Sequence, residues 1–360
     1  MHPRYDVRIF RKMCMSLSER DLSVYLVVSD GLGNESCEGV KIIDVGSFKG
    51  RVNRILNAPR KVLKEAVSLG CDLYHLHDPE LIPLGLKLLK LGKKVIFDAH
   101  EDFPKQMMAK PYLNPFLRRF LSVSFEVTER FLFSQFTAVI GATPSISRKF
   151  SKINDLSVNI NNYPICDELD AGSSKRRVGR CVTYMGDISE VRGVEQLVDA
   201  MAYTEAIRLN LAGEFTSEVF KSRIKGNPNI DKATELGFLS RGDLREVLAK
   251  SSAGIVTFLR SPNHLESQPN KMFEYMSSGI PVIASDFPLW REIIEGNDCG
   301  LCVNPEKPKE IAESIQFLVD NPSAGLKMGQ NGIQAVRDKY NWNIEERKLI
   351  RLYLRVLEAF

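Results

Sequence analysis

The chain has 360 residues, of which 44% are hydrophobic and 26% charged, and it carries a formal net charge of +4 at pH 7. This composition is typical of a folded globular protein and excludes a disordered chain, and the length favours two domains over one. The net positive charge is too small, and the lysines and arginines of the chain are too scattered, for a nucleic-acid-binding protein. It suits an anionic small ligand or an anionic membrane surface.

In the first half, strand-like and helix-like runs alternate, as in a doubly wound parallel sheet. The predicted strands are 22–30, 71–78, 93–101 and 136–143, and the predicted helices are 53–70, closed by Gly70, and 81–92, closed by Gly92. The opening, MHPRYDVRIF, looks like a loop and helix, whereas a Rossmann domain normally begins with an apolar strand. Either the sheet has one strand fewer or the natural chain starts upstream, and we favour the second interpretation.

The polar segment from Asp167 to Arg180 is the best candidate for an interdomain linker, and the alternation restarts after it. The predicted strands are 181–187, 208–214, 253–259, 280–286 and 299–304, and the predicted helices are 194–202, 243–251, 271–279, 308–321 and 341–360. We therefore expect an α/β chain with an N-terminal domain at 1–167, a C-terminal domain at 168–340 and a closing helix at 341–360.

The seven cysteines are odd in number and scattered, which favours a reducing compartment. Cys299 and Cys302 form a Cys-x-x-Cys pair without a second pair or a nearby histidine, so we interpret CGLCV as a buried strand and predict no metal site. The sequence shows no signal peptide and no apolar run of about 18 residues. These features predict a cytoplasmic protein.

The most informative motif is HLESQPNKMFEYMSSGIPVIASD, in which seven residues separate Glu266 from Glu274. We expect Glu274 to open a helix that ends at Gly279. One carboxylate on a loop at the carboxyl end of the sheet can accept hydrogen bonds from sugar hydroxyls, and a second near the helix start can hold a ribose diol. Lys271, beside the helix N-terminus, supplies a charge for a diphosphate. Two glutamates at this interval alone are equally compatible with a solvated helix face.

The whole string resembles the Glu-x7-Glu motif of family-4 retaining glycosyltransferases, of the bacterial polysaccharide and O-antigen assembly type. The tail EYMSSGIPVIASD is a close match, but the family has Phe-Gly after the first glutamate where this chain has Ser267 and Gln268. The resemblance implies the GT-B fold, in which two Rossmann-like doubly wound domains face a cleft and the C-terminal helix packs back toward the first domain.

A second segment, YMGDISEVRGVEQLVDAM, resembles the family's strand–loop–helix that receives the donor diphosphate. There Gly186 gives the backbone room, and Arg192 and Lys271 resemble the basic pair that neutralises the leaving nucleoside diphosphate. Gly237 and Phe238 resemble the residues that lie against the nucleobase. The resemblance implies His100, Arg192, Glu266 and Lys271 as catalytic residues, and Gly186, Arg192, Gly237, Phe238, Asn270, Lys271 and Glu274 as donor-binding residues.

In the first domain, polar residues follow two predicted strands at their carboxyl ends, where open α/β sheets bind ligands. His77 and Asp78 follow one strand, and Asp98 and His100 lie at the end of the next. A structural role for these histidines is the alternative. By resemblance His100 contacts the donor sugar. The acceptor side is expected to comprise His2, Asp6, His77 and Asp78.

Several absences also bear on function. The chain has no Asp-x-Asp, no P-loop, no Gly-x-Gly-x-x-Gly after a strand and no nucleophile elbow. With the resemblance, this predicts a retaining, metal-independent glycosyltransferase that needs no cofactor and moves a sugar from a nucleotide-sugar donor to a glycan or lipid-linked acceptor. A nucleotide-sugar epimerase on the same fold and a non-catalytic partner of a polysaccharide-assembly complex are the alternatives.

Residues 110–136 contain apolar side chains at helical spacing with basic neighbours. The apolar series includes Phe116, Phe120, Val123, Val127 and Phe131, and the flanking arginines are Arg118, Arg119 and Arg130. Such a face can dock on an anionic membrane, although core helices have the same pattern. We therefore expect either a core helix or a peripheral contact with the inner face of the cytoplasmic membrane.

Overall fold

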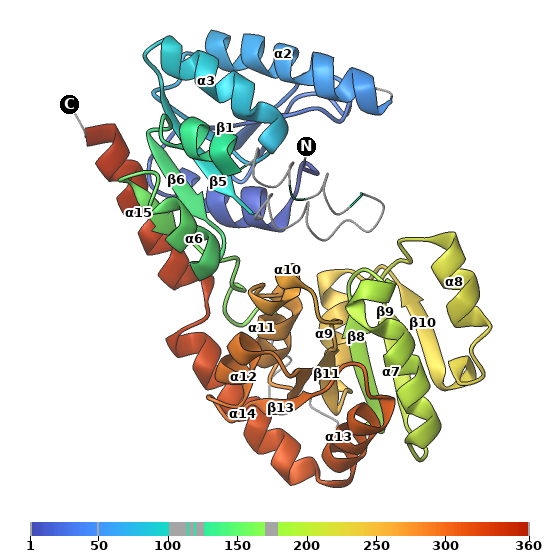
Figure 1. Ribbon diagram of the computed structural model, residues 1–360. Coiled ribbons are helices and arrows are strands. Elements are labelled where there is room, and N and C mark those ends of the chain that lie inside the picture. Colours follow the sequence, from blue (N-terminus) through green and yellow to red (C-terminus); the bar gives the residue numbers. More distant parts are fainter. Residues whose placement is uncertain are drawn as a thin grey trace. The chain divides into compact units, whose positions relative to one another are not determined.

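The computed structural model describes residues 2–48, 50–100, 114, 119, 126–169 and 179–358 (Figure 1). The chain forms two compact units, one comprising Met1–Asn162 with Trp342–Phe360 and the other Tyr163–Asn341. Each unit is an α/β structure with parallel strands, which confirms the expected fold class.

The boundary between the units falls a few residues ahead of the segment that the sequence indicates as a linker. Leu169 is buried in the core of the second unit, and the Glu168 carboxylate pairs with Arg241 in the same unit. The second unit begins already at Tyr163, because its ring is buried in the same core, 4.7 Å from the Phe273 ring. Residues 170–178 of the expected linker lie outside the described residues.

The first unit opens with helix, as the sequence predicts. The Asp6 carboxylate accepts hydrogen bonds from the backbone N–H groups of Arg8 and Ile9, which caps a π-helical segment, η1 (Val7–Cys14). Helix α1 (Met15–Ser18) continues η1, and Ile9 and Phe10 pack against the strands that follow.

The strands of the first unit form two separate sheets. In the three-stranded sheet the order is β1-β3-β2, with β1 parallel and β2 antiparallel to β3. The four-stranded sheet is parallel throughout, in the order β4-β5-β6-β7. The strands are β1 (Val24–Val28), β2 (Glu35–Cys37), β3 (Val40–Asp44), β4 (Leu73–Leu76), β5 (Lys94–Ala99), β6 (Ala138–Gly141) and β7 (Ser157–Asn159).

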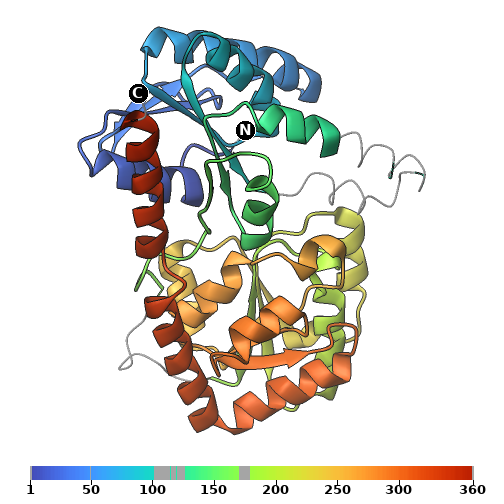
Figure 2. The same cartoon turned by 60° about the vertical axis from the view of Figure 1, so that its left-hand side comes forward.

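Helices cover both faces of these sheets. Helices α2 and α3 lie together over one face, and α15 lies over the other (Figures 1 and 2). The indole N–H of Trp342 donates to Ser16 Oγ at 2.9 Å, and the Glu345 carboxylate accepts from the Asn161 backbone at 2.9 Å, which ties α15 to this unit. The helices are α2 (Arg51–Leu69), η2 (Pro79–Leu81), α3 (Ile82–Lys90), α6 (Pro144–Phe150) and α15 (Trp342–Glu358), and residues 126–133 are also helical.

The second unit contains one six-stranded parallel sheet in the order β10-β9-β8-β11-β12-β13. Strand β8 lies near the centre of this sheet. Its Val182 lies opposite Leu209 of β9 on one side and opposite Ala253 of β11 on the other. The strands are β8 (Cys181–Met185), β9 (Arg208–Ala212), β10 (Ala233–Gly237), β11 (Ala253–Val256), β12 (Val282–Ser285) and β13 (Gly300–Val303). The Cys299–Cys302 segment runs into β13 and both thiols are free, as the strand interpretation requires.

Two apolar cores sandwich this sheet. One contains side chains of α9, α11, α12 and α14, and the other contains side chains of α7, α8 and α13. The helices are η4 (Glu190–Arg192), α7 (Val194–Ala200), η5 (Met201–Tyr203), α8 (Glu218–Lys225), η6 (Ile230–Lys232), α9 (Arg241–Ala249), α10 (Pro262–Leu265), α11 (Asn270–Ser277), α12 (Pro288–Ile294), α13 (Pro308–Asp320) and α14 (Pro322–Asp338). No helix among the described residues is both long enough and apolar enough to cross a bilayer.

Candidate functional site

The strand order of the second unit creates a switch point between β8 and β11. The chain proceeds from β8 outward through β9 and β10, and from β11 outward through β12 and β13. In open α/β sheets, ligands bind outside the carboxyl ends of the strands at such a point. Gly186 directly follows β8, and Phe258 lies two residues beyond β11, so these loops form the floor of the candidate site.

Two glycines let these loops approach each other closely. Gly193 has a φ of 70°, and a Cβ there would lie 1.8 Å from the Thr257 carbonyl oxygen. Gly186 has a φ of 102°, and a Cβ there would lie 3.0 Å from Lys271 Nζ. Only glycine adopts both conformations without strain, so these positions bring Arg192 and Lys271 to the carboxyl ends of β8 and β11.

The Lys271 ammonium group is buried and has no hydrogen-bond partner among the described residues. Lys271 is the second residue of α11, and its Nζ lies 4.0 Å from the centroid of the Tyr184 ring and 5.3 Å from that of Phe258. Burial, reinforced by the neighbouring Arg192 guanidinium, lowers the pKa of Lys271 to about 7. A buried cation without a hydrogen-bond acceptor is costly, so the position favours an anionic ligand.

Arg192 supplies a second positive charge next to Lys271. Its guanidinium carbon lies 4.2 Å from the centroid of the Phe258 ring, within range of a cation–π interaction. Arg192 closes the short segment η4 and precedes Gly193 and α7. The structure therefore brings together three residues that the sequence placed in one phosphate site, namely Gly186, Arg192 and Lys271.

The position of Glu274 differs from the sequence-based expectation. Helix α11 begins at Asn270, directly after Pro269, so Glu274 lies in its second turn and does not open the helix. Arg241 Nη1 donates to Glu274 Oε1 at 2.7 Å, and Arg241 Nη2 donates to Glu168 Oε2 at 2.5 Å. Arg241 and Glu168 are not predicted from the sequence, because a single arginine on another helix carries no local signal of its partner.

Glu266 lies at the exposed end of α10, and the next two residues hold the following loop in place. The Trp290 indole N–H donates to the Ser267 carbonyl at 2.8 Å, and the Tyr163 hydroxyl donates to Gln268 Oε1 at 3.2 Å. The two residues that depart from the family motif thus fix the backbone between Glu266 and α11.

The remaining predicted donor residues lie on the same unit. Gly237 ends β10 with a φ of 63°, and the Phe238 side chain that follows is 85% exposed. Asn270 is the exposed first residue of α11, next to Lys271. An apolar ring with this exposure is available to a flat ligand.

In the first unit, Asp98 is the centre of a charged cluster. Arg8 donates to both carboxylate oxygens at 2.9 Å, His77 Nδ1 lies 3.2 Å from Oδ2, and His100 Nε2 lies 3.5 Å from the same oxygen. Burial tends to raise the pKa of Asp98, but the charges of Arg8 and His100 hold it well below its usual range. Burial lowers the pKa of His100 to about 4, so this histidine is neutral near pH 7.

The structure also brings together the other residues predicted for the acceptor side. His2 Nδ1 lies 3.4 Å from Asp6 Oδ2, and His2 Nε2 lies 3.6 Å from Asp78 Oδ1. The hydrogen bond that His2 donates to the Asp6 carboxylate, opposed in part by burial, raises the pKa of His2. The rings of His2 and His77 each lie within 6 Å of the His100 ring, at 5.5 and 5.8 Å between centroids. These histidines and carboxylates form one polar cluster.

Among the described residues, one group has the spacing for a metal ion, comprising His75, His77 and Asp98. Both oxygens of Asp98 already accept hydrogen bonds from Arg8, and His75 Nδ1 pairs with the Tyr353 hydroxyl at 2.9 Å. A cation here would have to compete with the buried Arg8 guanidinium for the only carboxylate. The donor set therefore fits a buried ion pair better than a metal centre.

Residues 168–335 match the model of the family "Glycosyl transferases group 1". The chain is 23% identical over 324 residues to a phosphatidyl-myo-inositol mannosyltransferase of Mycobacterium leprae, covering 85% of this chain and 80% of the relative.

Among solved structures, the sucrose-phosphate synthase of Thermosynechococcus elongatus superposes with a TM-score of 0.78 at 16% identity, covering 97% of this chain and 92% of that one. Anabaena HepE in complex with UDP and glucose superposes with a TM-score of 0.68 at 13% identity, covering 88% and 87%. The chain is therefore a glycosyltransferase with the GT-B fold, and its residues 168–335 are similar to the glycosyl transferases group 1 family.

Proposed function

We propose that the second unit binds the diphosphate of a nucleotide sugar between Lys271 and Arg192, and that the chain transfers the sugar with retention of configuration and without a metal. The observation that carries this proposal is the Lys271 ammonium group, which is buried and finds no hydrogen-bond partner in the part of the chain that the structure describes. A diphosphate supplies the missing acceptor and the opposite charge. HepE, a relative in fold, was solved with UDP and glucose, which supports a ligand of this class.

The reaction breaks the bond between the anomeric carbon and the diphosphate oxygen, and negative charge accumulates on the departing diphosphate. Lys271 and Arg192 stabilise this charge more strongly in the transition state than in the ground state, which accelerates the step. The acceptor hydroxyl forms the new bond on the same face of the sugar, and its proton passes to the leaving phosphate oxygen. Two fixed cations perform the role that a divalent ion has in metal-dependent transferases.

We assign the remaining donor contacts by the same logic. Glu274 binds the ribose hydroxyls and Glu266 binds the sugar. Gly237 and Phe238 lie against the base, and Asn270 lies beside the diphosphate. Because Arg241 already occupies one oxygen of Glu274, a ribose diol binds to the other oxygen or shares the first.

The first unit provides the acceptor side in this proposal. Its polar cluster includes His2, Asp6, His77 and Asp78, and His100 contributes to catalysis by contacting the donor sugar. We propose a glycan or lipid-linked acceptor of surface polysaccharide synthesis and a hexosyl group as the cargo. The Mycobacterium leprae relative is named as a mannosyltransferase that acts on a phosphatidylinositol, which supports a hexose and a lipid-linked acceptor.

We further propose that the protein is cytoplasmic and contacts the inner face of the membrane peripherally. Val127 and Phe131 are 65% and 69% exposed on the helical residues 126–133, and Arg130 is exposed beside them. Phe116, Phe120, Val123 and Arg118 of the predicted face lie outside the described residues. Flotation with anionic and neutral vesicles tests this contact. We expect the protein to bind the anionic vesicles and Phe131→Asp to abolish this binding. A protein that does not float with anionic vesicles would contradict the proposed membrane contact.

The test of the donor assignment is isothermal titration calorimetry with UDP-, GDP-, ADP- and dTDP-linked sugars. We expect one donor class to bind, Lys271→Met and Arg192→Met to weaken it at least tenfold, and binding to persist in EDTA. NMR of the bound donor without acceptor separates transfer from epimerisation, because an epimerase changes the sugar on its own. No heat of binding with any donor, or unchanged affinity in both variants, would overturn the assignment.

A further inference from the structure

Two of the sheet edges among the described residues of the first unit, those formed by β1 and β4, line one cavity. β1 is an edge of the three-stranded sheet and β4 is an edge of the four-stranded sheet. In a parallel sheet, the backbone N–H and C=O groups of a strand point alternately to its two sides. Some of these groups in β1 and β4 therefore point away from the one strand that each of them pairs with. Backbone groups that are shielded from water need hydrogen-bond partners, and the residues of both edges line this cavity.

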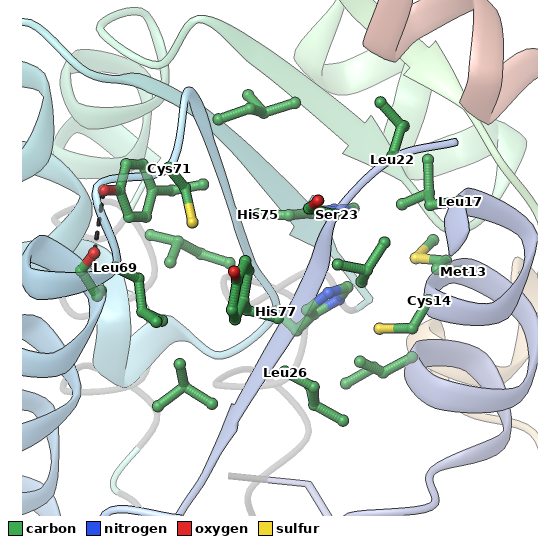
Figure 3. Close-up of a pocket in the computed structure, with 18 of the residues that line it drawn as sticks. Met13, Cys14, Leu17, Leu22, Ser23, Leu26, Leu69, Cys71, His75 and His77 are labelled. Atoms are coloured by element: carbon green, nitrogen blue, oxygen red, sulfur yellow. Dashed lines mark hydrogen bonds between the residues drawn. The ribbon is translucent and has the colours of Figure 1, made fainter. Parts of the chain in front are cut away.

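A cavity of about 590 Å³ lies between the two edges. Along its length it is lined by the consecutive residues 22–28, which include β1, and 71–78, which include β4. Figure 3 shows Leu69 and Cys71 on one side of this space and Met13, Cys14 and Leu17 on the other. The first side follows α2 and the second belongs to η1 and α1, so helices cover the cavity from both faces.

We propose that this cavity, which we call the strand slot, takes an extended apolar strand of polypeptide that runs parallel to β1 and β4 and joins the two sheets. β1 has five residues, and a strand of that length spans roughly 17 Å at about 3.3 Å per residue. One such strand offers N–H and C=O groups to both edges at once. Because helices cover both faces, the strand must be apolar on both of its faces.

The position of His2 fixes the direction of this strand. His2 and Pro3 line the same cavity, and His2 lies 3.6 Å from Asp78, just beyond the carboxyl end of β4. A strand parallel to β4 finishes at this end of the slot. A segment attached ahead of His2 therefore reaches the slot without a connecting loop.

A lipid tail is the alternative occupant, and the polar groups of the slot disfavour it. A hydrocarbon chain fills an apolar volume but offers no hydrogen bond to the two backbone edges. His75, which lines the slot, has a buried Nε2 that also lacks a hydrogen-bond partner among the residues that the structure describes. Leaving such groups unpaired is costly, and a polypeptide strand satisfies the edges.

The test compares three forms of the full chain, each extended ahead of His2 by six residues. The first extension is Lys-Ile-Val-Ile-Leu-Val, the second is a Gly-Ser repeat, and the third has proline in place of the central isoleucine, because proline cannot donate to a ladder. Hydrogen exchange is followed by mass spectrometry. We expect exchange at 22–28 and 71–78 to slow at least tenfold only with the first extension. Exchange in β2, the opposite edge of the same sheet, should stay unchanged.

Thiol labelling gives an independent readout that does not depend on donor binding. Cys14 and Cys71 line the slot, whereas Cys166 and Cys181 belong to the second unit and serve as references. We expect the apolar extension to slow alkylation of Cys14 and Cys71 several-fold and to leave the references unchanged. Equal protection by the Gly-Ser extension would overturn the proposal. Protection of both thiols by decanoate, with no slowing of exchange by the apolar extension, would overturn it in favour of a lipid pocket.

Discussion

Replacing Lys271 with methionine should stabilise the empty protein while weakening donor binding. The substitution keeps an unbranched apolar stem against Tyr184 and Phe258. It removes the buried ammonium group, for which the described residues offer no hydrogen-bond partner. Most substitutions of buried residues destabilise a protein. The opposite sign is expected here because the charge has no acceptor until the donor arrives.

The magnitude follows from the pKa of Lys271, which burial lowers from 10.5 to about 7. The difference of about 3.5 units corresponds to about 5 kcal/mol at about 1.4 kcal/mol per unit, and partial deprotonation leaves about 4 kcal/mol at pH 7. Because the folded-state pKa is the lower one, this cost is fully present below pH 7 and disappears as the pH rises from 7 to 10.5. The gain in stability from Lys271→Met should therefore be largest at or below pH 7 and vanish near pH 10.5.

Differential scanning calorimetry from pH 6 to 10 measures this gain, and titration calorimetry measures donor affinity. In units of this size each kcal/mol shifts the Tm by about 2–4 °C, so the gain of about 4 kcal/mol corresponds to a rise of about 8–16 °C at pH 7. Loss of a hydrogen bond from a charged group costs about 1.5–3 kcal/mol, which corresponds to roughly 10- to 150-fold weaker donor binding.

Lys232 offers a matched control in the same unit. Its Nζ donates to the Met201 and Thr204 carbonyls at 2.7 and 3.2 Å, so Lys232→Met should lower stability and leave donor affinity unchanged. A lower Tm for Lys271→Met at pH 7, or a wild-type donor affinity, would refute the reasoning that connects the buried charge to the diphosphate.

Three further outcomes follow from the same structure. Arg241→Met should lower the stability of the second unit by about 2–3 kcal/mol, because it removes hydrogen bonds to two carboxylates. Urea unfolding measures this loss, and Glu168→Gln in the same background should recover part of it. Gly193→Ala should cost at least about 1–3 kcal/mol and weaken donor binding, because its Cβ would lie 1.8 Å from the Thr257 carbonyl and displace Arg192. A wild-type Tm and donor affinity would contradict this packing. Since burial lowers the pKa of His100 from 6.5 to about 4, the cost of protonating His100 in the folded state should destabilise the first unit progressively as the pH falls from 6.5 to 4. The loss is about 3 kcal/mol, and His100→Gln should flatten that part of the stability–pH curve.

Local patterns in the sequence predicted much of the second unit. A short-range signal, consisting of a strand, a glycine and a helix start, occurs in the segment with Gly186 and Arg192–Gly193 and again in the string around Lys271. The doubly wound order then places the ends of β8 and β11 side by side. The sequence analysis missed β10, because Ala233–Gly237 is half-exposed and lacks a continuous apolar run. It also placed Glu274 at the start of a helix that begins at Asn270.

The sequence by itself determined the α/β class, the order of most elements and the residue types that meet at the phosphate site, because periodicity and glycine positions act over a few residues. Only the tertiary structure decided that the Lys271 ammonium is buried without an acceptor, that Arg241 bridges Glu168 and Glu274, and that the first unit has two sheets with a slot between them. These features depend on contacts between segments distant in the chain. Burial, which sets the cost of a charge or of an unpaired strand edge, is a property of the packed molecule and not of any local stretch of residues.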